Sequence, residues 1–189
     1  MKKTHYRTLW LSDIHLGNRD CKAEYLLSFL NSITVDTLYL VGDIVDMWQM
    51  TKQFRWPKAH NQVMHKFMQM SQDGTRVVYL PGNHDEPIQS YSGMAFGDIE
   101  IERELVHTTA QGKRYLVLHG DQFDGDVTMG KFHAWIGDKG YDLLLFLNRE
   151  FNRLRAWRKR EYWSLAGYIK KHIKGANEAI ARYREACCR

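Results

Sequence analysis

The sequence lacks the long apolar runs that mark signal peptides and membrane-spanning helices. Its N-terminus is basic, but only residues 8–11 follow before the polar Ser12 and Asp13. A secretory leader needs an apolar core of about 7–15 residues, and a membrane-spanning helix needs roughly 20. We therefore expect a cytosolic protein.

Cysteine is also scarce. The three cysteines, Cys21, Cys187 and Cys188, are odd in number and show no C-x-x-C spacing. Disulfide frameworks and thiolate zinc sites both depend on paired, regularly spaced cysteines. The sequence therefore favours free thiols.

Acidic residues become rare toward the C-terminus. Residues 149–189 contain 12 Lys and Arg against 4 Asp and Glu, whereas residues 1–148 contain 15 against 18. The calculated pI of about 9.1 therefore reflects the C-terminal segment. A basic segment suits phosphates, nucleic acid or an anionic membrane surface, and its charge alone does not choose among them.

The first part of the chain alternates between strand-like and helix-like patterns. A length of 189 residues with 44% hydrophobic residues is typical of one globular domain. Strands are predicted at 8–11, 37–41 and 76–80, and helices at 22–33 and 59–70. This order predicts βαβ units and a parallel sheet. We further expect an aromatic loop over 48–56, turns over 86–98, and strands 99–107 and 114–118 joined by a turn at Gly112.

The character of the sequence changes after residue 120. Residues 120–130 are loop-like, and 131–158 and 162–173 predict amphipathic helices with Arg and Lys on their polar sides. Residues 176–187 again show helical spacing, but the chain stops at Arg189 with no helix stop signal. We therefore expect a core over 1–124, a helical insertion over 125–175, and the start of a further core helix over 176–189 whose continuation is missing.

Polar residues with metal-binding side chains follow directly after four of the predicted strands. Strand ends of a parallel sheet meet at one edge, and carboxylate, amide and imidazole groups are the ligands that borderline-hard divalent cations take. The residues are Asp13, His15, Asp43, Asp46, Asn83, His84, Asp85, His119 and Asp121.

Each of these residues alone has a structural explanation. An Asp after a strand is most often a turn or helix cap, and a single His119 would be a hydrogen-bonded structural histidine. Together, in this order, they predict a pair of metal ions, which lie about 3.5–4 Å apart in such sites and can share one carboxylate, such as Asp43. His84 could stabilise the transition state or protonate the leaving oxygen, and Asp85 could orient it. The other histidines lack such a context and are interpreted as surface or structural residues: His5, His60, His65, His107, His133 and His172.

These motifs resemble those of the calcineurin-like metallophosphoesterase superfamily, whose pattern is D-x-H, G-D-x-x-D, G-N-H-D/E, a lone His, and G-H-x-H. The resemblance implies a four-layer αββα sandwich with two divalent metal ions. It also implies that His84 serves the transition state, with Asp46, Asp85 and Asp121 supporting the site. The implied ligands are Asp13, His15 and Asp43 for one metal, and Asp43, Asn83 and His119 for the other.

Within the superfamily, residues 12–17, 42–48 and 118–121 resemble those of the UDP-2,3-diacylglucosamine hydrolases. This resemblance implies cleavage of a nucleotide-linked lipid to UMP and 2,3-diacylglucosamine 1-phosphate, commonly with Mn²⁺. It also implies a helical insertion that forms a cap over the acyl chains and meets the inner membrane surface. Candidate contacts to the substrate or the membrane are Asp126, Arg158, Lys159 and Arg160.

No G-H-x-H motif follows His119, so by the resemblance each metal lacks one histidine. We expect a continuation of the chain or a second piece to supply it. Two alternatives stay open: a phosphoesterase of another substrate (a phosphoprotein, a cyclic nucleotide or, less expected, nucleic acid), and a non-enzymatic binding remnant. The basic helices could be a solvated face or a membrane-docking surface.

Overall fold

The computed structural model describes residues 3–123, 146–155, 157, 158, 163, 164 and 168. The chain forms two compact units, Met1–Asp121 and Gln122–Arg189, and each is described by itself. Most of the predicted insertion over 125–175 and all of the predicted helix over 176–189 lie outside the described residues.

The first unit is built on a five-stranded sheet with the order β1-β2-β3-β5-β4. β1, β2, β3 and β5 pair in parallel, and β4 pairs antiparallel with β5. The parallel sheet predicted from the strand–helix–strand order is confirmed. The strands are β1 (Thr4–Leu11), β2 (Ile33–Val41), β3 (Arg76–Leu80), β4 (Ala95–Phe96) and β5 (Ile99–Ile101).

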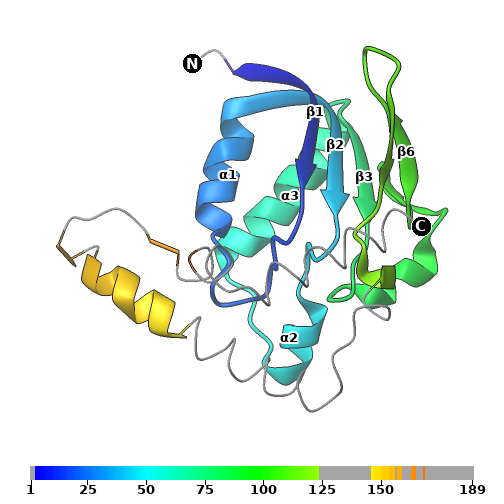
Figure 1. Ribbon diagram of the computed structural model, residues 1–189. Coiled ribbons are helices and arrows are strands. Elements are labelled where there is room, and N and C mark those ends of the chain that lie inside the picture. The colour runs from blue at the N-terminus through cyan, green and yellow to red at the C-terminus, as the bar shows by residue number, and fades with distance from the viewer. Residues whose placement is uncertain (1–2, 124–145, 156, 159–162, 165–167, 169–189) are drawn as a thin grey trace. The chain divides into compact units, whose positions relative to one another are not determined.

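Helices α1 (Ala23–Ser32) and α3 (Lys58–Gln72) lie on one side of this sheet (Figure 1). Their apolar residues recur at helical spacing, so Leu30, Val63 and Phe67 point inward and are fully buried. They share one core with Leu38 and with other residues of β2 and β3. Burying such a side chain contributes about 1.5–3 kcal/mol, and this packing holds the strands in register.

A two-stranded antiparallel sheet, β6 (Leu105–Thr108) and β7 (Arg114–Val117), packs on the opposite face. The single strand predicted over 99–107 is wrong. Residues 102–104 leave the first sheet, so Ile99–Ile101 and Leu105–Thr108 belong to different sheets. The Gly112 turn is confirmed, because its backbone N–H donates to the Thr109 carbonyl at 2.9 Å.

Two further segments differ from the prediction. The aromatic loop predicted over 48–56 overlaps the helix α2 (Met47–Lys52), because the Asp46 carboxylate accepts a hydrogen bond from the Gln49 N–H at 2.9 Å and caps its first turn. The turn-like segment 86–98 contains a 3₁₀ helix, Glu86–Tyr91, and the short strand β4.

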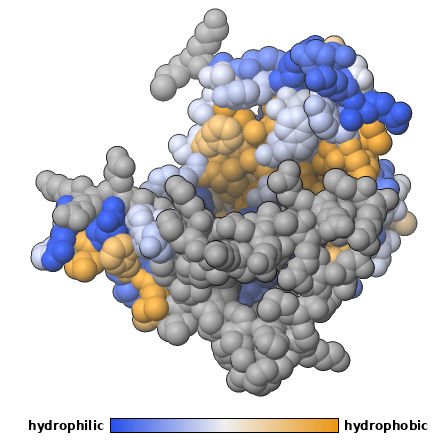
Figure 2. Space-filling view, in the orientation of Figure 1, coloured by the Kyte–Doolittle hydropathy of each residue, from blue (hydrophilic) through white to orange (hydrophobic). Residues whose placement is uncertain are grey.

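The described residues thus form three of the four predicted layers: helices, a mixed sheet and a second sheet. The fourth layer is not among them. Apolar side chains reach the surface in the upper part of Figure 2. The side chains of Trp10, Tyr115 and Leu116 are about half exposed, and they line a pocket of about 460 Å³ between β1 and β7.

In the second unit, residues 146–155 form a helix. This confirms the part of the helix predicted over 131–158 that these residues cover. The helix exposes Phe146, Leu147, Phe151 and Leu154 and also presents three arginines, so Figure 2 shows orange and blue side chains together on it. Among the described helices, none combines the length and apolar character needed to cross a membrane.

Candidate metal centre

Three of the predicted metal ligands have an unusual backbone. Asp13, His15 and Asp43 have φ angles of 53°, 54° and 55°, and they are the only non-glycine residues with positive φ in the described part of the chain. This left-handed conformation costs about 1–3 kcal/mol outside glycine and concentrates at functional sites. It marks the ends of β1 and β2 as a candidate site.

Backbone hydrogen bonds hold these strand ends together. The Asp13 N–H donates to the Gly42 carbonyl at 3.1 Å, and the His15 N–H donates to the Asp43 carbonyl at 2.8 Å. The Gly42 N–H in turn donates to the carbonyl of Leu80, the last residue of β3, at 2.6 Å. The parallel pairing of β1, β2 and β3 therefore continues into the loops that carry the polar side chains.

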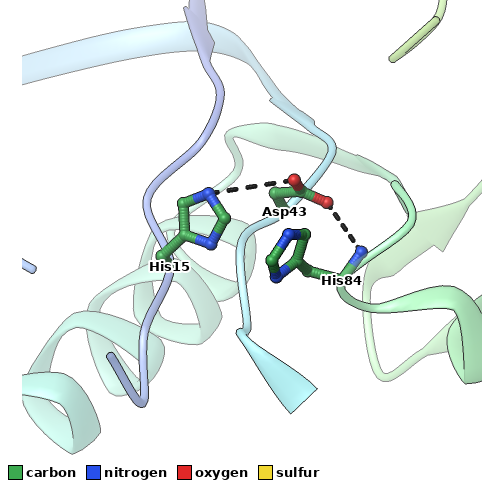
Figure 3. A group of neighbouring side chains, drawn as sticks. All are labelled: His15, Asp43 and His84. Atoms are coloured by element: carbon green, nitrogen blue, oxygen red, sulfur yellow. Dashed lines mark hydrogen bonds and ion pairs between the residues drawn. The ribbon is translucent and has the colours of Figure 1, made fainter. Parts of the chain in front are cut away.

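The buried Asp43 carboxylate lies between two histidines. Its Oδ2 is 3.8 Å from His15 Nε2, and its Oδ1 is 3.6 Å from His119 Nε2. The His84 backbone N–H donates to Oδ1 at 2.9 Å (Figure 3). Asn83 Oδ1 is 3.3 Å from His119 Nε2. The two oxygens of Asp43 therefore face two different sets of donor atoms.

The Asp46 carboxylate orients the other two imidazoles. His15 Nδ1 lies 3.2 Å from Asp46 Oδ2, and His84 Nδ1 lies 2.9 Å from Asp46 Oδ1. An ionised carboxylate only accepts hydrogen bonds, so both rings carry a proton on Nδ1 and leave Nε2 for other partners. Candidate ligand atoms of His15, Asp43 and His84 lie within 4.8 Å of one another.

These contacts shift the pKa values of the groups. Burial alone would raise the pKa of Asp46, but hydrogen bonds from the two imidazoles and from Asn18 hold it well below its usual range. The hydrogen bond to Asp46 raises the pKa of His84 against the opposing effect of burial. Trp48 packs edge to face on the His84 ring, with centroids 5.1 Å apart.

Asp85 has a different role from the predicted one. The carboxylate that contacts the His84 ring is Asp46, from the loop after β2. The fully buried Asp85 carboxylate accepts hydrogen bonds from the backbone N–H groups of residues 43, 44, 45 and 82 and from the Tyr79 hydroxyl. It therefore ties the loop after β2 to the loop after β3, and it does not orient the His84 ring.

Two glycines make room for His119. A Cβ on Gly42 would overlap the His119 ring, and a Cβ on Gly82 would lie 2.6 Å from His119 Cδ2 and would overlap Asp43 Oδ1. The glycines of the G-D and G-N motifs are therefore required because the imidazole packs directly against both backbones.

His119 reaches the site from the second sheet. The edge of the parallel sheet therefore supplies only the other four predicted ligands, Asp13, His15, Asp43 and Asn83. Asp121, two residues later, accepts hydrogen bonds from Arg103 and Gln89 at 3.0 and 3.2 Å. The sequence does not indicate the roles of Arg103 and Gln89, because neither residue lies in a motif and nothing in their spacing signals the contact.

The remaining predicted residues lie elsewhere. Arg158 is exposed, and its backbone N–H donates to the Leu154 carbonyl. Asp126, Lys159 and Arg160 lie outside the described residues. The interpretation of His60 as structural is confirmed: it is buried, and its Nδ1 accepts a hydrogen bond from the Gly17 N–H at 2.8 Å.

The donor set fits divalent cations. Imidazole nitrogens with carboxylate and amide oxygens, without thiolates, are typical ligands of metals such as Mn²⁺ and Zn²⁺. Each imidazole that is fixed by a carboxylate on one nitrogen presents the other nitrogen to the site, as in many metal centres.

Comparison with known proteins agrees with this chemistry. The chain is 30% identical over 117 residues to a UDP-2,3-diacylglucosamine hydrolase of Photorhabdus laumondii, covering 60% of this chain and 48% of that protein. Proteins of the same name from Chromohalobacter salexigens and Vibrio cholerae are each 29% identical, over 136 and 119 residues. These alignments cover 69% and 60% of this chain, and 54% and 46% of those proteins.

The chain thus spans about half the length of the curated relatives it matches. The model of one family, described as calcineurin-like phosphoesterase, matches residues 6–173. This match covers the strands and loops that carry all the polar residues of the site. The chain therefore belongs to the calcineurin-like phosphoesterase family.

Proposed function

We propose that the protein hydrolyses a phosphoester or pyrophosphate bond at a dinuclear metal centre. The family implies divalent metal ions. The observation that carries the two-metal arrangement is the Asp43 carboxylate, whose oxygens face His15 on one side and His119 on the other. In this proposal Asp13, His15 and Asp43 would hold one ion, and Asp43, Asn83 and His119 would hold the other.

When bound, such ions would polarise the phosphate, lower the pKa of water and neutralise charge in the transition state. The protein's own contribution is to position the phosphate and to move a proton. His84 is held at Nδ1 by Asp46, with its pKa raised, so its Nε2 can donate a proton to the leaving oxygen. Trp48 restricts the ring from one side.

For the substrate, we propose a nucleotide-linked lipid of the UDP-2,3-diacylglucosamine type, cleaved to UMP and the lipid 1-phosphate with Mn²⁺. The names of the relatives support this substrate. The helix over 146–155 supports it as well, since exposed apolar side chains beside arginines suit acyl chains and anionic surfaces. We propose that the helix over 146–155 is part of a helical insertion over 125–175. This insertion follows a core over 1–124 and meets the cytoplasmic face of the membrane.

The proposal is tested by Mn²⁺ content and UMP release. We expect wild-type protein to bind Mn²⁺ and to release UMP from UDP-2,3-diacylglucosamine. Asp43→Asn should lower Mn²⁺ affinity and activity by more than about 100-fold, because losing a partner of a ligand already costs about 10–100-fold. The control is Asp36→Asn, an exposed carboxylate on β2 that pairs with His5 away from the site.

Two results would refute parts of the proposal separately. Hydrolysis of simple phosphodiesters without UMP release would refute the lipid substrate and leave the metal centre standing. Wild-type protein that binds no Mn²⁺ would refute the centre itself.

A further inference from the structure

Four of the five predicted ligands follow strands of one hydrogen-bonded sheet, but His119 does not. Asp13, His15, Asp43 and Asn83 follow strands of the first sheet, which hydrogen bonds join throughout. His119 follows β7, which pairs with β6 in a separate sheet. Among the described strands no ladder joins the two sheets, so other contacts must fix the position of His119 relative to Asn83.

Two side chains outside every motif make this connection. The Arg103 guanidinium donates from one nitrogen to Asp121 Oδ2 at 3.0 Å and from another to the Pro81 carbonyl at 3.4 Å. The Gln89 amide nitrogen donates to the Gly82 carbonyl at 2.9 Å and to the same Asp121 oxygen at 3.2 Å. Each side chain therefore bridges the same two segments of the chain.

These segments carry the two ligands that the proposed function assigns to one ion. Pro81 and Gly82 directly precede Asn83, and Asp121 follows His119 by two residues. The Asn83 and His119 side chains are 3.3 Å apart, so a small shift of either segment would separate them. The Asp121 side chain is only 11% exposed and that of Arg103 is 35% exposed, so water weakens this ion pair less than it weakens a surface pair.

The geometry suits arginine in particular. A guanidinium presents several donors in a fixed plane, so one group can bond a carboxylate and a carbonyl together, whereas an ammonium acts as a compact point charge. Gln89 adds a second bridge without charge. The Arg103, Gln89 and Asp121 side chains are hereafter called the clamp.

We propose that Arg103 and Gln89 are positioning residues, which hold the His119 segment against the Asn83 loop and so form the half of the metal centre made by Asp43, Asn83 and His119. This inference rests on the proposed function. Neither residue contacts the reacting atoms; both act through the ligands. Loss of the clamp should therefore weaken binding of the ion assigned to Asp43, Asn83 and His119 more than binding of the other ion.

The test is Mn²⁺ titration of the full chain, with stoichiometry from elemental analysis and stability from urea unfolding. We expect Arg103→Ala to lower the affinity for one of the two Mn²⁺ ions by about 10–100-fold, the effect typical of losing a partner of a metal ligand. The affinity for the other ion should be unchanged. Gln89→Leu should weaken the same ion to a smaller degree. Arg103→Lys should restore part of the affinity, because it restores charge but not the planar pair of donors.

Arg76→Ala is the matched control. It removes an arginine that bonds Glu100 through two nitrogens at 2.8 and 2.6 Å, at the first residue of β3, the end far from Asn83. It should leave both ions bound as in the wild type.

Three outcomes would overturn the inference. If Arg103→Ala and Gln89→Leu both bind two ions with wild-type affinity, the clamp does not position the ligands, and the proposed function is unaffected. If Arg103→Ala and Arg76→Ala weaken both ions equally, the effect is one of general stability. If Arg103→Ala does not fold, the Mn²⁺ affinities of Gln89→Leu serve instead, and wild-type affinity for both ions would overturn the inference. Wild-type protein without bound Mn²⁺ would overturn the proposed function and this inference together.

Discussion

Gly82 provides a sharp test of how tightly the site is packed. Its φ angle lies outside the left-handed range, so an alanine is compatible with the backbone and any effect must come from the added Cβ. That atom would lie 2.6 Å from His119 Cδ2 and 2.7 Å from His119 Nε2, and it would overlap Asp43 Oδ1. Carbon atoms in contact prefer about 3.5–4.0 Å, so the imidazole must move by roughly 1 Å.

A displacement of about 1 Å in a reacting group can lower the rate about 100-fold. We therefore expect Gly82→Ala to lower kcat/KM by about this factor and to weaken the ion assigned to Asp43, Asn83 and His119. Overpacking should also reduce the free energy of unfolding by about 1–3 kcal/mol. Phosphodiester hydrolysis, Mn²⁺ titration and urea unfolding measure the three effects.

Gly112→Ala separates loss of stability from damage to the site. Gly112 has a φ of 77°, and a Cβ there would meet no atom within 4 Å. The variant should lose about 1–2 kcal/mol because alanine disfavours this backbone conformation, with unchanged Mn²⁺ binding and activity. Our account of the packing would be wrong if Gly82→Ala kept wild-type affinity for both ions.

Three other variants test the groups around the ligands. Tyr79→Phe removes the hydroxyl that donates to Asp85, so the free energy of unfolding should fall by about 1.5–3 kcal/mol in urea titrations; an unchanged value would show that water replaces the hydroxyl. Asp46→Asn removes the charge that orients both imidazoles and should weaken Mn²⁺ binding about 10–100-fold in titrations. Burial lowers the pKa of His60, so folding favours its neutral form and stability should fall as the pH drops below about 6.5. Urea unfolding between pH 8 and 5 should show a shallower fall for His60→Gln, and equal slopes would contradict this assignment.

The sequence was sufficient for the parts of the fold that depend on local pattern. The strand ends at Leu11, Val41 and Leu80 follow from short apolar runs that stop at Ser, Gly or Pro, and the βαβ order then determines that these ends meet. Helix α2 was missed because its cap is a side chain that was assigned to the metal site. The break between β5 and β6 was missed because residues 99–107 carry no turn signal.

The partner of His84 shows why contacts are harder to predict than strand ends. Asp85 is adjacent in sequence, but its carboxylate accepts hydrogen bonds from four backbone N–H groups and from the Tyr79 hydroxyl, and none from the His84 ring. The actual partner, Asp46, is separated by 38 residues. Sequence patterns indicate which residues reach the edge of the sheet, and only the packing of the loops decides which side chains then touch.

Three carboxylates that are not among the predicted ligands organise this site. Asp46 joins the loop after β1 to the loop after β3, and Asp85 joins the loops after β2 and β3. Asp121 joins the segment after β7 to the loop after β3 through Arg103 and Gln89, which bond both. A hydrogen bond to an ionised group contributes about 1.5–3 kcal/mol, which is similar to the cost of one left-handed ligand residue. The loop after β3 takes part in all three connections, so we infer that this loop, which carries Asn83 and His84, is the element on which the geometry of the whole centre depends.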